Sequence, residues 1–336
     1  LLTSRVSGRI SDHEGQISSV DFSPDGALLA TAGSDDGTVK LRDPESGESL
    51  RTLTYEDNFM HILSFSPDSK QLAATFRDWP EPRDGSQGLI VWDVQSGEEL
   101  WTVTVEETLL GEFAYSPDGG RLAAVKNDLG LPGFIIWDAA TGEELLNNAG
   151  SQEGMLLPFY HNIDFSPDGQ LMSTSSALVT DFGTGDLASS SSSPLTNEAV
   201  IYDANTGAQV TSFTHSEEDV NIIAAAFHPD GQRFATLTYM GNVYVWDIET
   251  GERLASGKTR DDPTFFLKFT PDGQQMIVMG DDAFSLAFLD SDTGEEVQRI
   301  PGDHWALSPQ AIDFTPDGQQ FLSPLTAGEA VFIDLG

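Results

Sequence analysis

One short turn sequence, Phe-Ser-Pro-Asp-Gly or a close variant of it, occurs seven times along the chain. The copies occupy residues 22–26, 65–69, 115–119, 165–169, 227–231, 269–273 and 314–318. Proline presets φ at about −65° at the first central position of a β-turn, and the Asp-Gly that follows allows the chain to reverse. Such a repeat indicates units that pack on their neighbours, because one unit alone cannot bury its apolar faces.

A second pattern follows every copy: an apolar stretch that ends in aspartate, and in most copies a Gly-Glu turn after it. The aspartates are Asp43, Asp93, Asp138, Asp203, Asp247, Asp290 and Asp334. In the first repeat, apolar segments at 17–22, 28–31, 39–42 and 50–53 are separated by turn residues, which predicts four short strands. Four antiparallel strands in each unit of roughly 40–50 residues are typical of a β-propeller blade. The sequence therefore predicts an all-β, seven-bladed β-propeller.

The pairs Trp92-Asp93, Trp137-Asp138 and Trp246-Asp247, together with the two kinds of turn, resemble the WD-repeat β-propeller family over essentially the whole chain. The resemblance implies four-stranded antiparallel blades and a rim that binds partners. It also implies that the three tryptophans lie in the core between blades.

The family's fuller pattern adds a polar network, in which a His before the first strand and an Asp before the third are linked to the Trp through Ser or Thr. His13, His215 and His304 stand near the His position, and Asp36 fits the Asp position in the first repeat. Arg42 replaces the Trp of that repeat, and Met240 stands where the fifth repeat would have its Asp. We therefore expect no repeat to hold the complete network, and apolar packing to hold the blades together.

The two ends of the chain predict how the ring closes. Residues 331–334 have the pattern of a third strand, and residues 1–10 precede the first repeat where a fourth strand would lie. Residues 1–10 are thus expected to supply the outermost strand of the last blade. Hydrogen bonds between the two ends would then close one propeller domain over residues 1–336.

Loop length predicts where a partner binds. The Pro-Asp-Gly and Gly-Glu turns hardly vary and are expected on one rim, which we call the turn rim. The insertions at 76–87, 126–133, 150–161 and 176–198 fall on the other, the insertion-bearing rim. Variable loops with large aromatic side chains on a rigid scaffold favour binding. The candidate partner-binding residues are Trp79, Phe159, Tyr160, Phe182, Tyr239, Phe265, Trp305, Arg77 and Arg83. Lys126 and Arg260 are expected to add positive charge to the same rim.

The net charge of the chain limits the classes of partner that we expect it to bind. The chain has 16 Lys and Arg against 54 Asp and Glu, a formal net charge of −38. Such a surface repels phosphate backbones and anionic lipid, so we expect neither nucleic-acid binding nor docking on a membrane. The longest apolar run, at 222–227, is too short to span a bilayer. A protein or peptide partner remains.

Catalytic motifs are missing from the sequence. There is no cysteine, the six histidines lack metal-ligand spacing, and no nucleophile elbow or phosphate-binding loop occurs. We expect a non-catalytic protein-interaction scaffold with no cofactor and no metal. The alternatives are a hydrolase or the accessory propeller of a larger enzyme, and a structural subunit of a cell-surface assembly. The acidity, the absence of cysteine and the start at Leu1 favour an extracellular or cell-surface protein, with the cytoplasm of a salt-adapted organism as the alternative.

Overall fold

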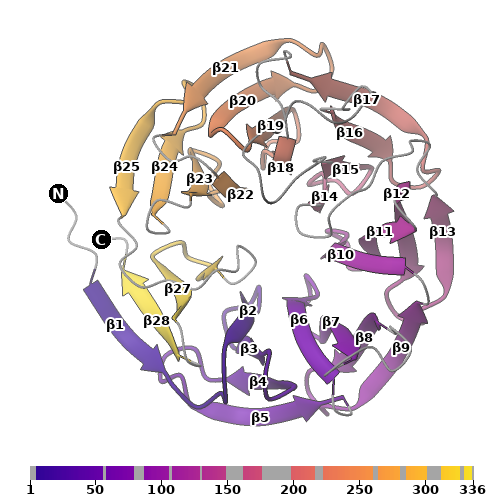
Figure 1. The fold of residues 1–336 in the computed structure, drawn as a ribbon, viewed down its shortest axis with the longest axis vertical. Coiled ribbons are helices and arrows are strands. Elements are labelled where there is room, and N and C mark those ends of the chain that lie inside the picture. The colour runs from indigo at the N-terminus through magenta and orange to yellow at the C-terminus, as the bar shows by residue number, and fades with distance from the viewer. Residues whose placement is uncertain are drawn as a thin grey trace, which may run out of the picture.

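Seven four-stranded antiparallel sheets form a ring around a central channel (Figure 1). The computed structural model describes residues 5–55, 58–78, 87–105, 108–128, 131–148, 162–175, 198–215, 222–259, 264–280, 285–300, 312–325 and 329–334. Within each blade the first strand lines the channel and the fourth lies at the outer edge. The predicted fold, a seven-bladed all-β propeller, is confirmed.

The blades are numbered here in chain order. Blade 1 contains β2 (Ile17–Phe22), β3 (Leu29–Gly33), β4 (Thr38–Arg42) and β5 (Ser49–Thr54), and blade 2 contains β6 (Asn58–Phe65), β7 (Gln71–Asp78), β8 (Gln87–Asp93) and β9 (Glu99–Val105). Blade 3 contains β10 (Thr108–Tyr115), β11 (Arg121–Asp128), β12 (Leu131–Asp138) and β13 (Glu144–Asn148), and blade 4 contains β14 (Ile163–Phe165), β15 (Leu171–Ser175), β16 (Glu198–Asp203) and β17 (Gln209–Thr214). Blade 5 contains β18 (Ile222–Phe227), β19 (Arg233–Thr238), β20 (Asn242–Asp247) and β21 (Arg253–Lys258), and blade 6 contains β22 (Thr264–Phe269), β23 (Gln275–Gly280), β24 (Leu286–Asp290) and β25 (Glu296–Ile300). Blade 7 contains β26 (Asp313–Phe314), β27 (Gln320–Leu325), β28 (Glu329–Asp334) and β1 (Arg5–Ile10).

Blade 7 closes the ring with strands from both ends of the chain. Strand β1 pairs antiparallel with β28, in a register that runs from Arg5 opposite Asp334 to Ile10 opposite Ala330. Figure 1 shows β1 lying outside β28, at the outer edge of the ring. The prediction that the N-terminal segment supplies the last blade's outer strand is confirmed for Arg5–Ile10.

The repeated aspartates build the turns on which the fold depends. In the first Pro-Asp-Gly turn, Asp25 Oδ1 accepts hydrogen bonds from Ser23 Oγ at 2.7 Å and from the Ala27 N–H at 3.0 Å. Gly26 has a φ of 71°, in the region that glycine tolerates best. The second copy has Ser69 at this position with a φ of 61°, so the turn geometry is kept even without glycine.

The two kinds of turn lie on the same rim, as expected. In blade 2, the Val94 N–H at the Gly-Glu turn donates to the Lys70 carbonyl beside the Pro-Asp turn at 2.9 Å. The Ile248 N–H and the Gln232 carbonyl make the same bond in blade 5, also at 2.9 Å. These contacts define the turn rim in the structure.

The core consists of apolar clusters between neighbouring blades, because each sheet buries both of its faces. Trp92 belongs to the cluster between blades 1 and 2, and Trp137 to the cluster between blades 2 and 3; each is 2% exposed. Trp246 is half-buried and packs against the cluster between blades 4 and 5. The three tryptophans therefore serve packing.

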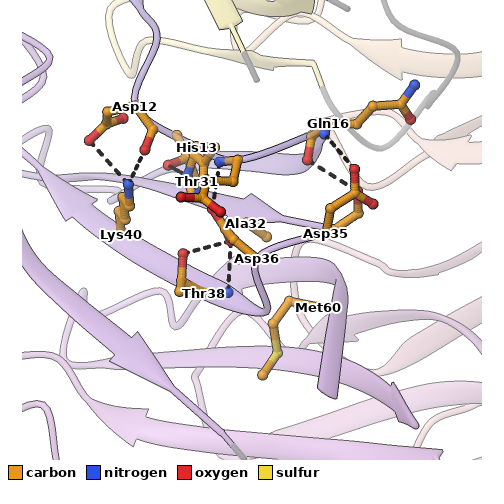
Figure 2. Close-up of polar contacts among 12 residues, drawn as sticks. Asp12, His13, Gln16, Thr31, Ala32, Asp35, Asp36, Thr38, Lys40 and Met60 are labelled. Atoms are coloured by element: carbon orange, nitrogen blue, oxygen red, sulfur yellow. Dashed lines mark hydrogen bonds and ion pairs between the residues drawn. The ribbon is translucent and has the colours of Figure 1, made fainter. Parts of the chain in front are cut away.

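Blade 1 holds a complete polar network in which arginine takes the place of tryptophan. Figure 2 shows its members His13, Thr31 and Asp36. His13 Nδ1 lies 2.8 Å from Asp36 Oδ2, and His13 Nε2 lies 2.8 Å from Thr31 Oγ1. Arg42 Nε donates to the same Thr31 oxygen at 2.9 Å. Burial opposes ionisation of Asp36, but hydrogen bonds from His13 and Thr38 hold its pKa below the usual value.

The expectation that the blades rely on apolar packing needs one correction, since blade 1 buries this network. Arg42 is 1% exposed, and its guanidinium is paired with Asp12 Oδ1 at 2.6 Å. Blade 5 has the shorter version expected without its Asp: Trp246 Nε1 donates to Thr236 Oγ1 at 2.9 Å, and His215 Nε2 lies 3.0 Å from the same oxygen. The third histidine of this type, His304, lies outside the described residues.

Candidate functional site

Blades 2 and 3 extend farther toward the insertion-bearing rim than blade 1 does. The ladder between β7 and β8 continues to Arg77 opposite Gln87, and the ladder between β11 and β12 continues to Asp128 opposite Leu131. Strands β6, β7, β10, β11 and β12 each have eight residues, whereas β2 has six. Regular hydrogen-bonded strands thus reach the base of the insertion at 76–87. The expected insertion at 126–133 needs a correction, because residues 126–128 belong to β11 and residues 131–133 to β12.

Few of the predicted binding residues fall in described parts of the chain. Arg77 is exposed near the end of β7. Tyr239 is half-buried and packs against the cluster between blades 5 and 6, and its carbonyl accepts the Thr264 N–H at 3.1 Å. Phe265 lies in β22, but its side chain is outside the description. Trp79, Arg83, Phe159, Tyr160, Phe182, Trp305 and Arg260 lie outside the described residues.

Lys126 differs from the expectation of a surface cation. It is 7% exposed in β11, because the long ladder of blade 3 encloses this position. Among the described cations named for this rim, Arg77 is therefore the exposed one.

The inner strands of the blades enclose a second candidate, a cavity of about 160 Å³ in the central channel. Its lining is apolar except for a polar group of residues: Asp21, Glu112, Asn162, Lys268 and Asp313. Lys268 Nζ pairs with Asp313 Oδ1 at 2.9 Å, and half of the lysine side chain is exposed. Asn162 Nδ2 donates to Glu112 Oε2 at 2.9 Å.

Three channel aspartates each join their own blade to the next one. Asp313 Oδ2 accepts the Phe22 N–H at 2.9 Å, and Asp21 Oδ2 accepts the Phe65 N–H at 2.6 Å. The same geometry recurs between blades 4 and 5, where Asp164 Oδ2 accepts the Phe227 N–H at 3.0 Å. These carboxylates satisfy backbone donors at the blade junctions, which gives them a structural role.

Burial changes the acidity of this group. It raises the pKa of Asp164 to about 6, although hydrogen bonds from two backbone N–H groups oppose the change. Burial, together with the nearby Asp313 charge, raises the pKa of Asp21 well above its usual range. The charge of Asp313 in turn raises the pKa of Lys268. The channel is therefore a weakly acidic, structural centre with one ammonium group among several carboxyl groups.

This centre was not among the predicted sites, although the sequence contains a signal for it. An aspartate directly precedes the phenylalanine of the turn motif in three repeats, at Asp21, Asp164 and Asp313, and a lysine does so at Lys268. In the described part of the chain, no group of three or more His, Cys, Asp or Glu could hold a metal ion. No described segment forms a helix long and apolar enough to cross a membrane.

The outer strands expose one aliphatic side chain each, at the residue left unpaired by a bulge against the third strand. Between 45% and 60% of each residue is exposed in blades 1 to 6: Leu50, Leu100, Leu145, Val210, Leu254 and Val297. Each belongs to a different blade. They are thus single surface residues, which are common on soluble proteins, and do not form one apolar docking face.

Comparisons with known proteins agree with the prediction that the chain contains WD-type repeats. The family model described as "WD domain, G-beta repeat" matches residues 4–43. WD repeat-containing protein 1 of Gallus gallus is 34% identical over 68 residues, which are 19% of this chain and 11% of that protein.

Two further relatives are small ribosomal subunit protein RACK1 of Brassica napus, 32% identical over 90 residues, and eukaryotic translation initiation factor 3 subunit I of Phaeosphaeria nodorum (strain SN15 / ATCC MYA-4574 / FGSC 10173), 34% identical over 84 residues. The alignments cover 27% and 25% of this chain, and 24% of each relative. The chain thus matches a quarter or less of the length of these curated relatives.

Proposed function

Because this chain is a WD-repeat β-propeller, we propose that it is a non-catalytic scaffold that binds a protein or peptide partner on its insertion-bearing rim. The observation that carries the proposal is the extension of blades 2 and 3 toward this rim, where the strands of blade 2 support the insertion at 76–87. Rigid strands that hold variable loops lower the entropy lost when a partner orders them.

The surface of the turn rim differs less from one blade to the next, because its turns repeat almost unchanged. Asp43, Asp138 and Asp203 each accept hydrogen bonds from the N–H and hydroxyl groups of their own turn. These carboxylates are engaged in building the turns. A partner specific for one face is therefore expected to use the side with the insertions, where Arg77 is exposed.

Site-specific photo-crosslinking tests this proposal. A photoreactive residue at position 79 or 305 should form adducts with a partner in an extract of the native host, identified by mass spectrometry. The matched control carries the photoreactive residue at position 143, on the turn rim of blade 3. Adducts that form from position 143 and from neither of the other two would contradict the proposal.

Truncation provides the quantitative test once a partner is identified. Trp79→Ala or Trp305→Ala should weaken binding by more than about 1 kcal/mol, as removal of an aromatic anchor does at protein interfaces. Thermal melting should be unchanged, which separates loss of contact from loss of fold. Unchanged affinity in both variants would show that these rings cover their own loops.

Two alternatives have no observation in their favour among the described residues: a hydrolase or accessory propeller of a larger enzyme, and a structural subunit of a surface assembly. For location, the net charge of −38 and the absence of cysteine support an extracellular or cell-surface site. The cytoplasm of a salt-adapted organism is the alternative. Fractionation of the native cells with an antibody against the chain decides between the two.

A further inference from the structure

A groove of about 460 Å³ opens on the turn rim between blades 7 and 1. It is lined by Phe22 and Phe332 and by Gly8, Pro44 and Pro316. Glu45 and Asp317 also line it and are exposed. The volume falls in the range of about 300–1,000 Å³ that is usual for ligand pockets.

Comparison with the other blades explains why the groove exists. Gly8 pairs with Phe332, the position that Arg51, Trp101, Leu146, Thr211, Ala255 and Gln298 occupy on the outer strands of blades 1 to 6. In blade 2, Trp101 fills this position and packs beneath the Gly-Glu turn of blade 3, where a Cβ on Gly142 would lie 2.8 Å from the indole. Trp101 Nε1 also donates to the Ala139 carbonyl of that turn at 3.0 Å.

Ile10 keeps the groove open after the loss of this side chain. Between blades 5 and 6 the corresponding residues are both small, Ala255 and Gly257, and the turn of blade 6 collapses onto the strand so closely that a Cβ on Gly257 would collide with the Gly294 carbonyl. At the ring closure, Ile10 occupies the position of Gly257, and a Cβ on Gly47 would lie 3.3 Å from Ile10 Cγ1. The Ile10 side chain therefore holds the Gly-Glu turn of blade 1 away from Gly8.

Pro44 separates the turns on the other side of the groove. The corresponding residues Val94, Ala139, Ala204, Ile248 and Ser291 each donate their N–H to a carbonyl of the Pro-Asp turn in the same blade. Proline has no N–H, so blade 1 cannot make this bond. The space between the two turns of blade 1 and the space left by the missing side chain at Gly8 are therefore parts of the same groove.

We propose that this groove binds an aromatic side chain, in particular an indole, from a partner peptide that carries basic residues beside it. Trp101 shows which side chain fits beneath such a turn, and the Pro44 carbonyl is the counterpart of the acceptor that Trp101 uses. Phe22 and Phe332 provide apolar and aromatic contact for the ring. Glu45 and Asp317 attract positive charge on either side of it.

This site lies on the rim opposite the one proposed above, and the inference does not depend on that proposal. A scaffold with one binding site on each rim can hold two partners at the same time. The two sites are tested with different variants, so that failure of one leaves the other intact.

A fluorine NMR titration tests the groove. The probe is a tripeptide with 5-fluorotryptophan between two lysines, capped at both ends, titrated with the full chain. We expect binding, and a loss of affinity of about tenfold or more in Gly8→Trp, whose own indole would occupy the groove. Gly8 has no left-handed φ, and a Cβ there would lie 3.0 Å from Phe332 Cδ2, so a small ring movement accommodates the new side chain.

Two further variants and two control peptides complete the design. Thr211→Leu fills the corresponding position in blade 4 and should leave the affinity unchanged. Glu45→Lys should weaken binding of the lysine peptide several-fold and strengthen binding of the same peptide made with two glutamates. Since Glu45 is exposed, this variant is expected to fold even if Gly8→Trp does not. A peptide with alanine in place of the tryptophan should not bind.

Three results would overturn the proposal. The first is unchanged binding to Gly8→Trp and Glu45→Lys, and the second is no binding to the unmodified chain. The third is binding that appears only after residues 1–4 are removed, because the groove would then belong to the chain's own N-terminal segment.

Discussion

Replacing Asp164 by asparagine is expected to stabilise the protein at neutral pH, because its carboxylate is ionised there at a cost. Burial raises the pKa of Asp164 from 3.8 to about 6. Each pKa unit is worth about 1.4 kcal/mol, so full ionisation costs the folded state up to about 3 kcal/mol. Because Asp164 is only half-buried, screening by solvent reduces the expected effect to about 1–2 kcal/mol.

The sign of the pH dependence follows from the direction of the pKa change. A carboxyl group with a raised pKa stabilises the folded state fully below pH 3.8, and that contribution disappears as the pH rises through 6. Asparagine does not titrate, and its Oδ1 can still accept the Phe227 N–H. Asp164→Asn should therefore exceed the original protein in stability at pH 7.5 and lose this advantage near pH 4.

Urea unfolding followed by tryptophan fluorescence at a series of pH values measures this difference. Asp118→Asn is the control, because hydrogen bonds from Ser116 Oγ and the Gly120 N–H lower the pKa of this turn carboxylate. It should lose stability at neutral pH, and the loss should shrink as the pH falls. A difference between Asp164→Asn and the original protein that stays constant from pH 4 to 8 would refute the reasoning.

Three further predictions concern stability. Deleting residues 1–10 removes β1 from blade 7 and should lower the melting temperature sharply; an unchanged melting curve would contradict closure by this strand. Trp101→Ala leaves a cavity beneath the turn of blade 3 and an unpaired Ala139 carbonyl, and should cost about 3–5 kcal/mol in urea unfolding. With a net charge of −38, the melting temperature should rise with NaCl as the Debye length falls from about 10 Å at 0.1 M to about 3 Å at 1 M; a flat response would show that the acidic side chains are already compensated.

The blade count, the strand order and the closure were predictable from the sequence, because the turn chemistry is local and recurs in register. The Pro-Asp-Gly turn is built by its own Asp25 and Ser23, so no distant information is needed to place it. The network of blade 1 was only partly predictable. His13 and Asp36 were identified from the sequence, but Thr31 and Asp12 were not. The replacement of tryptophan by Arg42 hid the fact that a guanidinium can supply the same donor.

Contacts between blades were not predictable in this way. The bond from the Phe22 N–H to Asp313 joins residues at opposite ends of the chain, and its partner depends on the geometry of the ring. The groove could not be predicted from the sequence, because each outer strand contains a bulge. Gly8 aligns with Trp101 only once the unpaired residue of each outer strand is known. Lys126 was wrongly expected to be exposed, because the length of a loop in the sequence does not show how far the hydrogen-bonded ladder between two strands continues.

The mixed origin of blade 7 has a consequence for synthesis on the ribosome. Within the propeller, strand β1 is synthesised before its partner β28 and before all the blades between them, so β1 must wait unpaired while the six intervening blades form. Contacts between such distant residues are slow to form, because a long loop has to close first. A waiting strand with free edges can pair with another chain. The last step in forming the ring, and the one most exposed to misassembly, is therefore the docking of β1 onto β28.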